Sequence, residues 1–217
     1  MAGAASAALI RWCPAGQNLA SALAALVDNI ARVADRILVY GVTGSGKTVM
    51  ARQIAVRTGL PWHEVDYLTW EPGWVIVPAD EQRRRIAAIC AGERWILDTA
   101  YGAWLELPLA RVQLIVALDY PRWRSLARLV RRTLLRNLDH KPICNGNTES
   151  WRQTFSRHSI IVWHFQSFAR KRDRIRAWVA DRSGPEVVRL TSPAVARRWL
   201  DGLGVADAPG DAPADAQ

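Results

Sequence analysis

The chain has 217 residues and a formal net charge of +9, from 29 Lys and Arg residues against 20 Asp and Glu residues. Half of its residues are hydrophobic, which is typical of a domain that buries a core and excludes a wholly disordered chain. The longest uncharged run is too short and too polar for a transmembrane helix, and the N-terminus lacks a basic secretory start, so we expect a cytoplasmic protein without a membrane partner.

The basic excess has two interpretations. It is typical of nucleic-acid-binding proteins, but lysine occurs only at positions 47, 141 and 171, so nearly all of the excess is arginine. A compositional bias together with anionic phosphate ligands explains this at least as well, and nucleic acid stays the less favoured partner. The three cysteines lack the spacing of a zinc site or a disulfide framework.

The two ends of the chain differ from its middle. Residues 1–35 are an Ala-rich N-terminal extension in which apolar residues recur at helical spacing over 18–34, and this predicts one helix that packs outside the main domain. Residues 204–217 are rich in Ala, Asp, Pro and Gly and are predicted to be disordered. The folded domain is therefore expected over 36–203.

A phosphate-binding motif opens that domain. The apolar run 37–40 predicts a buried parallel strand. Gly41-Val42-Thr43-Gly44-Ser45-Gly46-Lys47-Thr48 follows and fills every fixed position of the pattern G-x-x-x-x-G-K-[ST]. A helix is predicted behind it, ending at Gly59. Strand, loop and helix thus come in the order that places backbone N–H groups and a helix N-terminus on phosphate oxygens.

This motif assigns the nucleotide-binding residues. Lys47 is expected to reach the β- and γ-phosphates of ATP, and the Thr48 hydroxyl to hold Mg²⁺. The residues expected to bind ATP are Gly41, Thr43, Gly44, Ser45, Gly46, Lys47, Thr48 and Val49.

The rest of the chain alternates between predicted strands and helices. Strands are expected at 62–66, 94–98, 112–118 and 186–190, with helices at 78–91 and 121–136, two helical pieces within 148–181, and a last helix from Ser192 to about Gly202. With the first strand, this makes a five-stranded parallel sheet covered by helices on both faces, an α/β fold whose ligands bind at the carboxyl ends of the strands.

Three aspartates follow predicted strands and so should lie at that edge. Asp98 is favoured as the second Mg²⁺ ligand. Asp119 matches the same pattern, although a helix cap before Pro121 explains it equally well. Asp66 is either the base toward the acceptor hydroxyl or a turn residue.

Arginines and tryptophans supply the remaining candidates. On the helix 121–136, arginines cover one arc and apolar residues the other. Arg128 and Arg132 are the best candidates for contacts with phosphate, against the alternative of a solvated helix face. Trp70 and Trp74 are expected to form a stacking wall for a substrate ring. Trp95, Trp123 and Trp163 are expected in the core, and the run Arg170-Lys171-Arg172 on the surface.

On these motifs the chain resembles the adenylate-kinase-like P-loop proteins, in particular the bacterial group known as DNA topology modulation proteins or AAA-family ATPases. The resemblance implies a three-layer P-loop nucleoside-triphosphate hydrolase fold with a five-stranded parallel sheet of the nucleotide/shikimate kinase type. It also implies ATP and Mg²⁺ binding, a lid formed by the arginine helix, and an acceptor side around Trp70–Trp74.

Where adenylate kinase has D-G-F-P-R, this chain has Asp98-Thr99-Ala100-Tyr101-Gly102, so the arginine that grips AMP there is missing. The segments that carry the resemblance are the phosphate loop, His63-Glu64-Val65-Asp66, Trp70 with Pro72-Gly73-Trp74, Trp95-Ile96-Leu97-Asp98 with Tyr101, Leu118-Asp119-Tyr120-Pro121-Arg122-Trp123, and Cys144-Asn145-Gly146-Asn147 with Glu149.

The sequence therefore predicts an ATP-dependent kinase of a small, nucleotide-like acceptor, acting as a monomer or homodimer. The alternative is an ATP-dependent nucleic-acid-associated regulator without kinase activity. The predicted catalytic residues are Lys47, Arg128, Arg132 and Asp66, and the predicted substrate residues are Asp66, Trp70, Trp74 and Tyr101.

Overall fold

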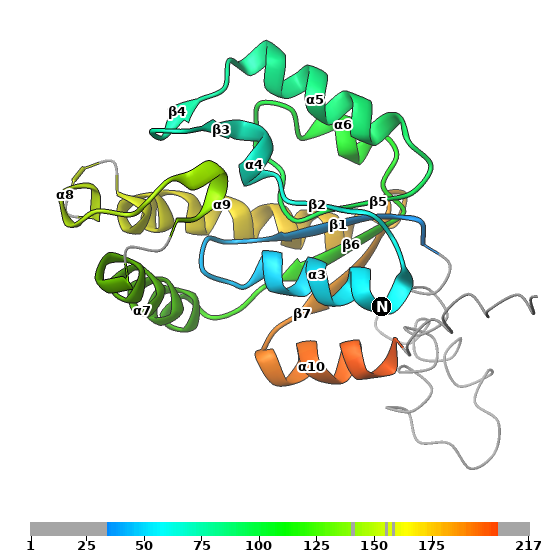
Figure 1. Ribbon diagram of the computed structural model, residues 1–217. Coiled ribbons are helices and arrows are strands. Elements are labelled where there is room, and N and C mark those ends of the chain that lie inside the picture. Colours follow the sequence, from blue (N-terminus) through cyan, green and yellow to red (C-terminus); the bar gives the residue numbers. More distant parts are fainter. Residues whose placement is uncertain (1–33, 140–141, 155, 158, 204–217) are drawn as a thin grey trace, which may run out of the picture.

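The computed structural model describes residues 34–139, 142–154, 156–157 and 159–203 (Figure 1). The helix predicted over 18–34 and the tail predicted at 204–217 therefore fall outside the described residues, apart from residue 34. Within the described ranges, none of the helices combines the length and the hydrophobicity that crossing a bilayer requires.

Five parallel strands form the central sheet, in the order β2-β5-β1-β6-β7. β1 lies in the middle, where Ile37 is paired with Ile96 of β5 on one side and with Leu114 of β6 on the other. This arrangement confirms the predicted five-stranded parallel sheet. The strands are β1 (Arg36–Gly41), β2 (Trp62–His63), β5 (Trp95–Leu97), β6 (Leu114–Leu118) and β7 (Glu186–Leu190).

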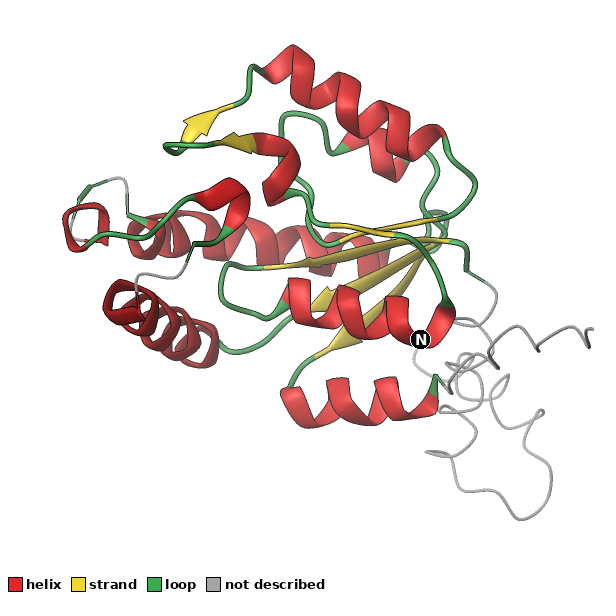
Figure 2. Ribbon diagram, in the orientation of Figure 1, coloured by secondary structure: helices red, strands yellow, loops and turns green. Residues whose placement is uncertain are grey.

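Helices cover both faces of this sheet and complete three layers (Figures 1 and 2). α3 (Lys47–Thr58) and α10 (Pro193–Gly202) lie on one face. The other face is covered by α5 (Ala79–Ala91), α6 (Glu106–Leu109) and α9 (Ile160–Ala180).

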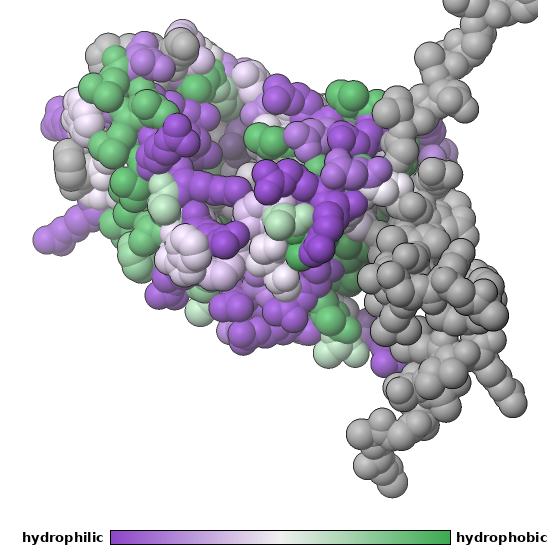
Figure 3. All heavy atoms as spheres, turned by 90° about the horizontal axis from the view of Figure 1, so that it is seen from below, coloured by the Kyte–Doolittle hydropathy of each residue, from purple (hydrophilic) through white to green (hydrophobic). Residues whose placement is uncertain are grey.

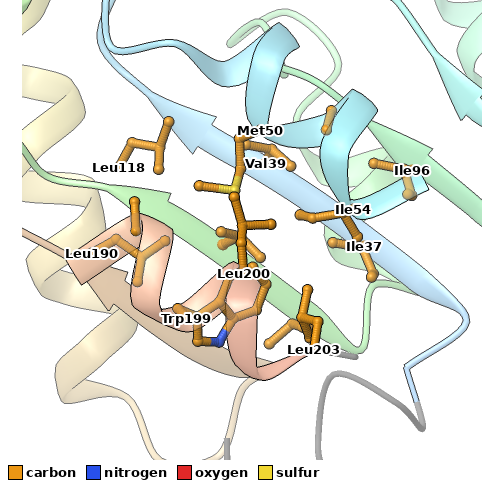
Figure 4. Packing of buried hydrophobic residues seen from close by; sticks show 14 of the residues in the cluster. Ile37, Val39, Met50, Ile54, Ile96, Leu118, Leu190, Trp199, Leu200 and Leu203 are labelled. Carbon is orange, nitrogen blue, oxygen red and sulfur yellow. The ribbon is translucent and has the colours of Figure 1, made fainter. Parts of the chain in front are cut away.

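Alternation along β1 divides the core between the two faces. Ile37 and Val39 pack into the cluster that contains Met50 and Ile54 of α3 and Trp199 of α10 (Figure 4). The residues between them, Leu38 and Tyr40, pack into the second cluster with side chains of α5 and α9. Both faces of β1 are thus fully buried, as the continuous apolar run predicts for a parallel strand.

Local signals set several helix ends where the sequence predicts them. Gly59 follows α3 with φ 65°, a left-handed conformation that glycine adopts without strain, and its N–H donates to the Ala55 carbonyl. The Ser192 side chain accepts from the Val195 N–H and caps α10. The segment 148–181 is indeed two helices, α8 (Trp151–Thr154) and α9.

The predicted strand 62–66 is too long. β2 ends at His63, and Asp66 begins the short helix α4 (Asp66–Thr69). The chain leaves the sheet because the Val65 N–H donates to the Asp98 side chain instead of to a neighbouring strand. The following aromatic loop forms a two-stranded antiparallel hairpin, β3 (Trp70–Glu71) and β4 (Val75–Ile76).

The arginine helix, α7 (Arg122–Asp139), packs with a different face from the expected one. Its buried residues are Ser125, Leu129, Thr133 and Asn137, and the apolar stripe faces outward. Trp123 is 65% exposed, so its expected place in the core is wrong. Trp163 is also exposed, whereas Trp95 is buried as expected.

The outward stripe of α7 lines an open groove of about 730 Å³. In Figure 3, hydrophobic surface gathers on the side of the molecule where α7 lies in Figure 1. The apolar residues of this groove are Trp123, Leu126, Ala127, Val130, Leu134, Leu135 and Leu138.

Candidate active site

The phosphate loop turns sharply between β1 and α3. Gly44 and Gly46 have φ of 80° and 95°, which L side chains rarely adopt. A Cβ added at Gly44 would lie 2.4 Å from the Ser125 carbonyl oxygen of α7. Glycine is therefore required at position 44 both by the backbone and by the close approach of α7, which makes α7 one wall of the loop.

The polar side chains of the loop differ in their partners. Lys47 Nζ donates to the Val42 carbonyl at 3.2 Å. Burial lowers the pKa of Lys47, while the carboxylates of Asp66 and Asp98 act in the opposite direction. Ser45 is buried and its hydroxyl has no hydrogen-bond partner. The Val49 side chain is exposed, and its backbone N–H lies in the first turn of α3.

Asp98 lies directly against the loop. It accepts from the Thr48 hydroxyl at 2.7 Å and from the Val65 N–H at 2.9 Å, and it is 3% exposed. Burial raises the pKa of Asp98. A hydroxyl and a carboxylate at this spacing fit Mg²⁺, which takes hard oxygen ligands and is usually bound by one or two carboxylates together with phosphates and water.

Asp119 serves a different contact. Its carboxylate accepts from Arg172 of α9 at 2.9 Å and from Arg189 of β7 at 2.8 Å. These ion pairs tie α9 and β7 to the end of β6. Of the two carboxylates that the sequence leaves as competing Mg²⁺ ligands, Asp98 is therefore the one at the Thr48 hydroxyl.

Asp66 and Tyr101 are in direct contact. Tyr101 Oη donates to Asp66 Oδ1 at 2.7 Å. Burial, and next to it the Asp66 carboxylate, raise the pKa of Tyr101 well above its ordinary value. Asp66 is exposed and acts electrostatically on Lys47 and Asp98. The fold thus brings Asp66 and Tyr101 together with the loop lysine and Asp98.

Trp70 and Trp74 lie edge to face, with ring centroids 5.7 Å apart and an interplanar angle of 80°. The Trp74 indole N–H donates to the Thr148 carbonyl at 2.9 Å. The two rings therefore pack on each other, and their expected role as a stacking wall for a substrate ring stays a prediction.

Two asparagines between α7 and α8 hold this hairpin, and we call Asn145 and Asn147 the asparagine clamp. Asn147 accepts from the Trp74 backbone N–H at 2.8 Å and donates to the Glu71 carbonyl at 3.0 Å. Asn145 donates to the Tyr67 carbonyl at 3.0 Å. The sequence gives these residues no role, because no local pattern marks a contact across more than 70 positions.

The arginine arc of α7 divides among several environments. Arg128 donates to the Ser45 carbonyl at 3.3 Å. Arg132 is half-buried, its Nε lacks a hydrogen-bond partner, and its pKa is lowered by burial and then by Arg136. Arg136 is paired with Glu149 at 2.9 Å, and Arg124 stacks on the exposed Trp123 ring. Arg128 and Arg132 are therefore the two arginines of the arc that lie near the loop, and neither forms a salt bridge with a carboxylate among the described residues.

α9 contributes two residues that the sequence does not predict. His164 is fully buried, and its Nδ1 lies 3.0 Å from the Thr43 carbonyl oxygen. Lys171 Nζ lies 3.4 Å from the Gly41 carbonyl oxygen, and the residue is 7% exposed. The expectation that Lys171 lies on the surface is wrong. The available signal is helical spacing, because positions 164, 167, 168, 171 and 175 form the buried stripe of α9.

Comparisons with known proteins bear on the fold. The chain is similar to a shikimate kinase from Acinetobacter baumannii, with a TM-score of 0.50 and 14% identity over 80% of this chain and 93% of that chain. A gluconokinase from Sinorhizobium meliloti 1021 aligns with a TM-score of 0.46 and 19% identity over 77% of this chain and 90% of that chain. No protein-family model and no curated protein sequence matches the chain.

At these identities the likeness concerns the fold alone. The chain has the α/β P-loop nucleoside-triphosphate hydrolase fold, with a five-stranded parallel sheet. The comparisons give no support to the DNA topology modulation group.

Proposed function

We propose that the protein is a Mg²⁺-dependent kinase that transfers the γ-phosphoryl group of ATP to a hydroxyl of a small, nucleotide-like molecule. The observation that carries this proposal is the Thr48–Asp98 hydrogen bond of 2.7 Å at the end of a complete phosphate loop. Asp98 also binds the backbone of Val65, next to Asp66. One carboxylate therefore links the nucleotide side of the site to the acceptor side. The fold shared with a shikimate kinase supports a small-molecule acceptor.

On the nucleotide side, the glycine-rich turn and the start of α3 present N–H groups and the positive end of the helix dipole to phosphates. Lys47 would leave the Val42 carbonyl and bind the β- and γ-phosphates. Arg128 and Arg132 would approach the same phosphates from α7. Thr48 and Asp98 would hold Mg²⁺, which neutralises charge on the phosphate oxygens when bound.

On the acceptor side, Asp66 is the base. The acceptor oxygen forms a bond to the γ-phosphorus, the bond from that phosphorus to the β–γ bridging oxygen breaks, and ADP leaves. The hydroxyl proton passes to Asp66. Tyr101 would orient this carboxylate. Its hydroxyl donates to Asp66 Oδ1, which fixes the orientation of the Asp66 side chain and leaves Oδ2 for the acceptor. Trp70 and Trp74, both half-buried, would border the acceptor.

The test is acceptor-dependent release of ADP in a screen of nucleosides, nucleotides, sugars and hydroxy acids. Lys47→Ala serves as the blank, because it removes the contact with phosphate. Asp66→Asn should lower acceptor-dependent turnover roughly 100- to 10,000-fold, the usual contribution of a general base. The affinity for Mg·ATP, measured by calorimetry, should stay within about threefold, because Asp66 is not assigned to the nucleotide.

The matched control is Asp80→Asn, which removes an exposed carboxylate in the first turn of α5 and should leave turnover unchanged. The kinase proposal fails if no acceptor raises ADP release above the rate in water. It also fails if Asp66→Asn retains the acceptor-dependent rate. Retained Mg·ATP affinity in Lys47→Ala would overturn the assignment of the nucleotide site itself.

A further inference from the structure

A second lysine lies beneath the phosphate loop. Lys171 comes from the middle of α9, and its ammonium group lies 3.4 Å from the carbonyl oxygen of Gly41, the first residue of the loop. The same group lies 5.6 Å from the centroid of the Tyr40 ring. Lys171 therefore meets the chain where β1 passes into the loop, on the opposite face of the sheet from α3.

The positive charge of the Lys171 ammonium group is not balanced by a nearby carboxylate among the described residues. Among the described residues, no carboxylate comes within ion-pair distance of Lys171, and its ammonium group makes one long hydrogen bond and lies over one aromatic ring. A buried charge without a close counter-ion destabilises a fold by several kcal/mol. A position that serves only packing rarely carries a buried lysine. The burial of Lys171 therefore indicates that an anion binds near it during function.

The charged groups around Lys171 belong in part to the proposed site. Lys47 of α3 and Asp66 of α4 both act electrostatically on Lys171, together with its own neighbours Arg170 and Arg174 on α9. Lys171 and Lys47 also act electrostatically on His164, which lies two turns earlier on α9. Lys171 thus lies within electrostatic range of the residues proposed for the phosphate donor and for the acceptor.

We propose that Lys171 is a second phosphate-binding lysine, which reaches the nucleotide from the α9 side of the loop while Lys47 reaches it from the α3 side. This inference rests on the proposed nucleotide site. It assigns α9 a direct part in phosphate binding, in addition to its packing on the sheet.

The charge state of Lys171 provides the measurement. Burial, and then the Lys47 ammonium, lower the pKa of Lys171 to about 7. At pH 8 most ligand-free molecules therefore carry a neutral amine. An arriving phosphate favours the charged form and raises this pKa, so nucleotide binding at pH 8 should take up about one proton from the buffer.

Calorimetry with the full chain tests this. A non-hydrolysable ATP analogue with Mg²⁺ is titrated at pH 8 in two buffers of different ionisation enthalpy, and the difference in observed heat gives the number of protons bound. Lys171→Met should abolish the uptake and weaken affinity roughly 10- to 100-fold, the range for a hydrogen bond to a charged group. Lys171→Arg should also abolish the uptake, because arginine is already charged, while keeping most of the affinity.

Thermal unfolding at pH 7 separates this role from a structural one. Lys171→Met should raise the melting temperature, because it replaces a buried charge with an apolar chain of similar length. The control is Arg176→Met, an exposed residue on the same helix that is paired with Asp173, which should change neither proton uptake nor affinity.

Proton uptake that persists in Lys171→Met would overturn the inference, as would unchanged nucleotide affinity in that variant. If Lys171→Met does not fold, Lys171→Arg decides, and uptake equal to that of the wild type overturns the inference. A wild-type protein that binds no nucleotide at all would instead overturn the proposed function. A wild-type protein that binds nucleotide without proton uptake overturns only the role of Lys171.

Discussion

Several side chains of the candidate site destabilise the folded protein because they bury charges or unpaired polar atoms. Asp98 is buried as a carboxylate whose pKa is raised by that burial, and Lys171 is buried as a cation whose pKa is lowered. Ser45 and Arg132 each keep a buried polar atom without a hydrogen-bond partner. Such groups are typical of sites where function, and not stability, determines the residue.

Replacing Asp98 should lower activity and raise stability at the same time. Asp98→Asn keeps an oxygen for the Val65 N–H but loses the charge that would hold Mg²⁺. We expect Mg²⁺-dependent turnover to fall at least about 100-fold. The free energy of unfolding at pH 7 should rise by about 0.5–2 kcal/mol.

The sign follows from the raised pKa of Asp98. The folded state disfavours the ionised form, so the gain from asparagine is present above that pKa and disappears as the pH falls and Asp98 takes up its proton. Chemical denaturation at pH 7 and at pH 4 measures the difference. Turnover that depends on Mg²⁺ as in the wild type would contradict the assignment of Asp98.

At this scale the sequence predicts what a local pattern encodes. The loop from Gly41 to Thr48 is recognisable because its chemistry needs glycines and a lysine at fixed spacing. The burial of Lys171 is not recognisable, because it depends on where α9 crosses β1. Its neighbours Arg170 and Arg172 make the run look like an exposed basic surface, and only the helical spacing from His164 separates Lys171 from them.

At the scale of elements, the asparagine clamp joins two parts of the site. The clamp lies between α7, which carries the loop-facing arginines, and the hairpin β3–β4, which carries Trp70 and Trp74. Arg136 of α7 is further tied to Glu149, just after the clamp. The arginine helix and the acceptor-side hairpin are therefore coupled, and movement of one is expected to move the other.

Asn147→Ala should loosen this coupling. Asn147 is buried and makes three side-chain hydrogen bonds, to the Trp74 N–H and to the Glu71 and Cys144 carbonyls. Losing them should lower the free energy of unfolding by about 1–3 kcal/mol. Hydrogen exchange of the Trp74 amide should accelerate, because its acceptor is removed.

Asn147→Asp is the matched comparison. It keeps an acceptor for the Trp74 amide and loses both donors, so it should destabilise the protein while leaving that amide protected. An unchanged exchange rate for Trp74 in Asn147→Ala would show that the clamp does not hold the hairpin.

The sequence identifies most helices and strands but not all of their faces. α7 is amphipathic, and an amphipathic helix ordinarily turns its apolar stripe toward the core. Here Ser125 and Leu129 pack against the phosphate loop at Gly44, where the close approach leaves no room for a side chain on the loop. That tertiary contact turns Trp123 outward, and no periodicity in the helix itself reveals it.

Across the whole molecule, Asp119 joins three elements. Its side chain is 2% exposed, whereas the side chains of Arg172 and Arg189 are 32% and 39% exposed. Asp119→Asn should lower the free energy of unfolding by about 1–3 kcal/mol, less than for a fully buried ion pair because solvent screens both arginines.

Thermal unfolding measures this as a fall of roughly 2–4 °C per kcal/mol for a domain of this size. Asp173→Asn removes an exposed carboxylate paired with Arg176 and should change the melting temperature by less than about 1 °C. Equal effects of the two substitutions would show that Asp119 does not anchor α9 and β7.

The division of the core between the two faces of the sheet has a consequence for how the protein can evolve. α10 packs Trp199 and Leu200 on one face and supplies none of the proposed site residues, whereas α9 supplies both core residues and the contacts with Gly41 and Thr43. Substitutions on α10, whether natural or engineered, are thus limited only by the space that its side chains fill in the core. On α9 a change in packing also displaces the groups that contact the phosphate loop, so this helix is expected to accept far fewer sequences.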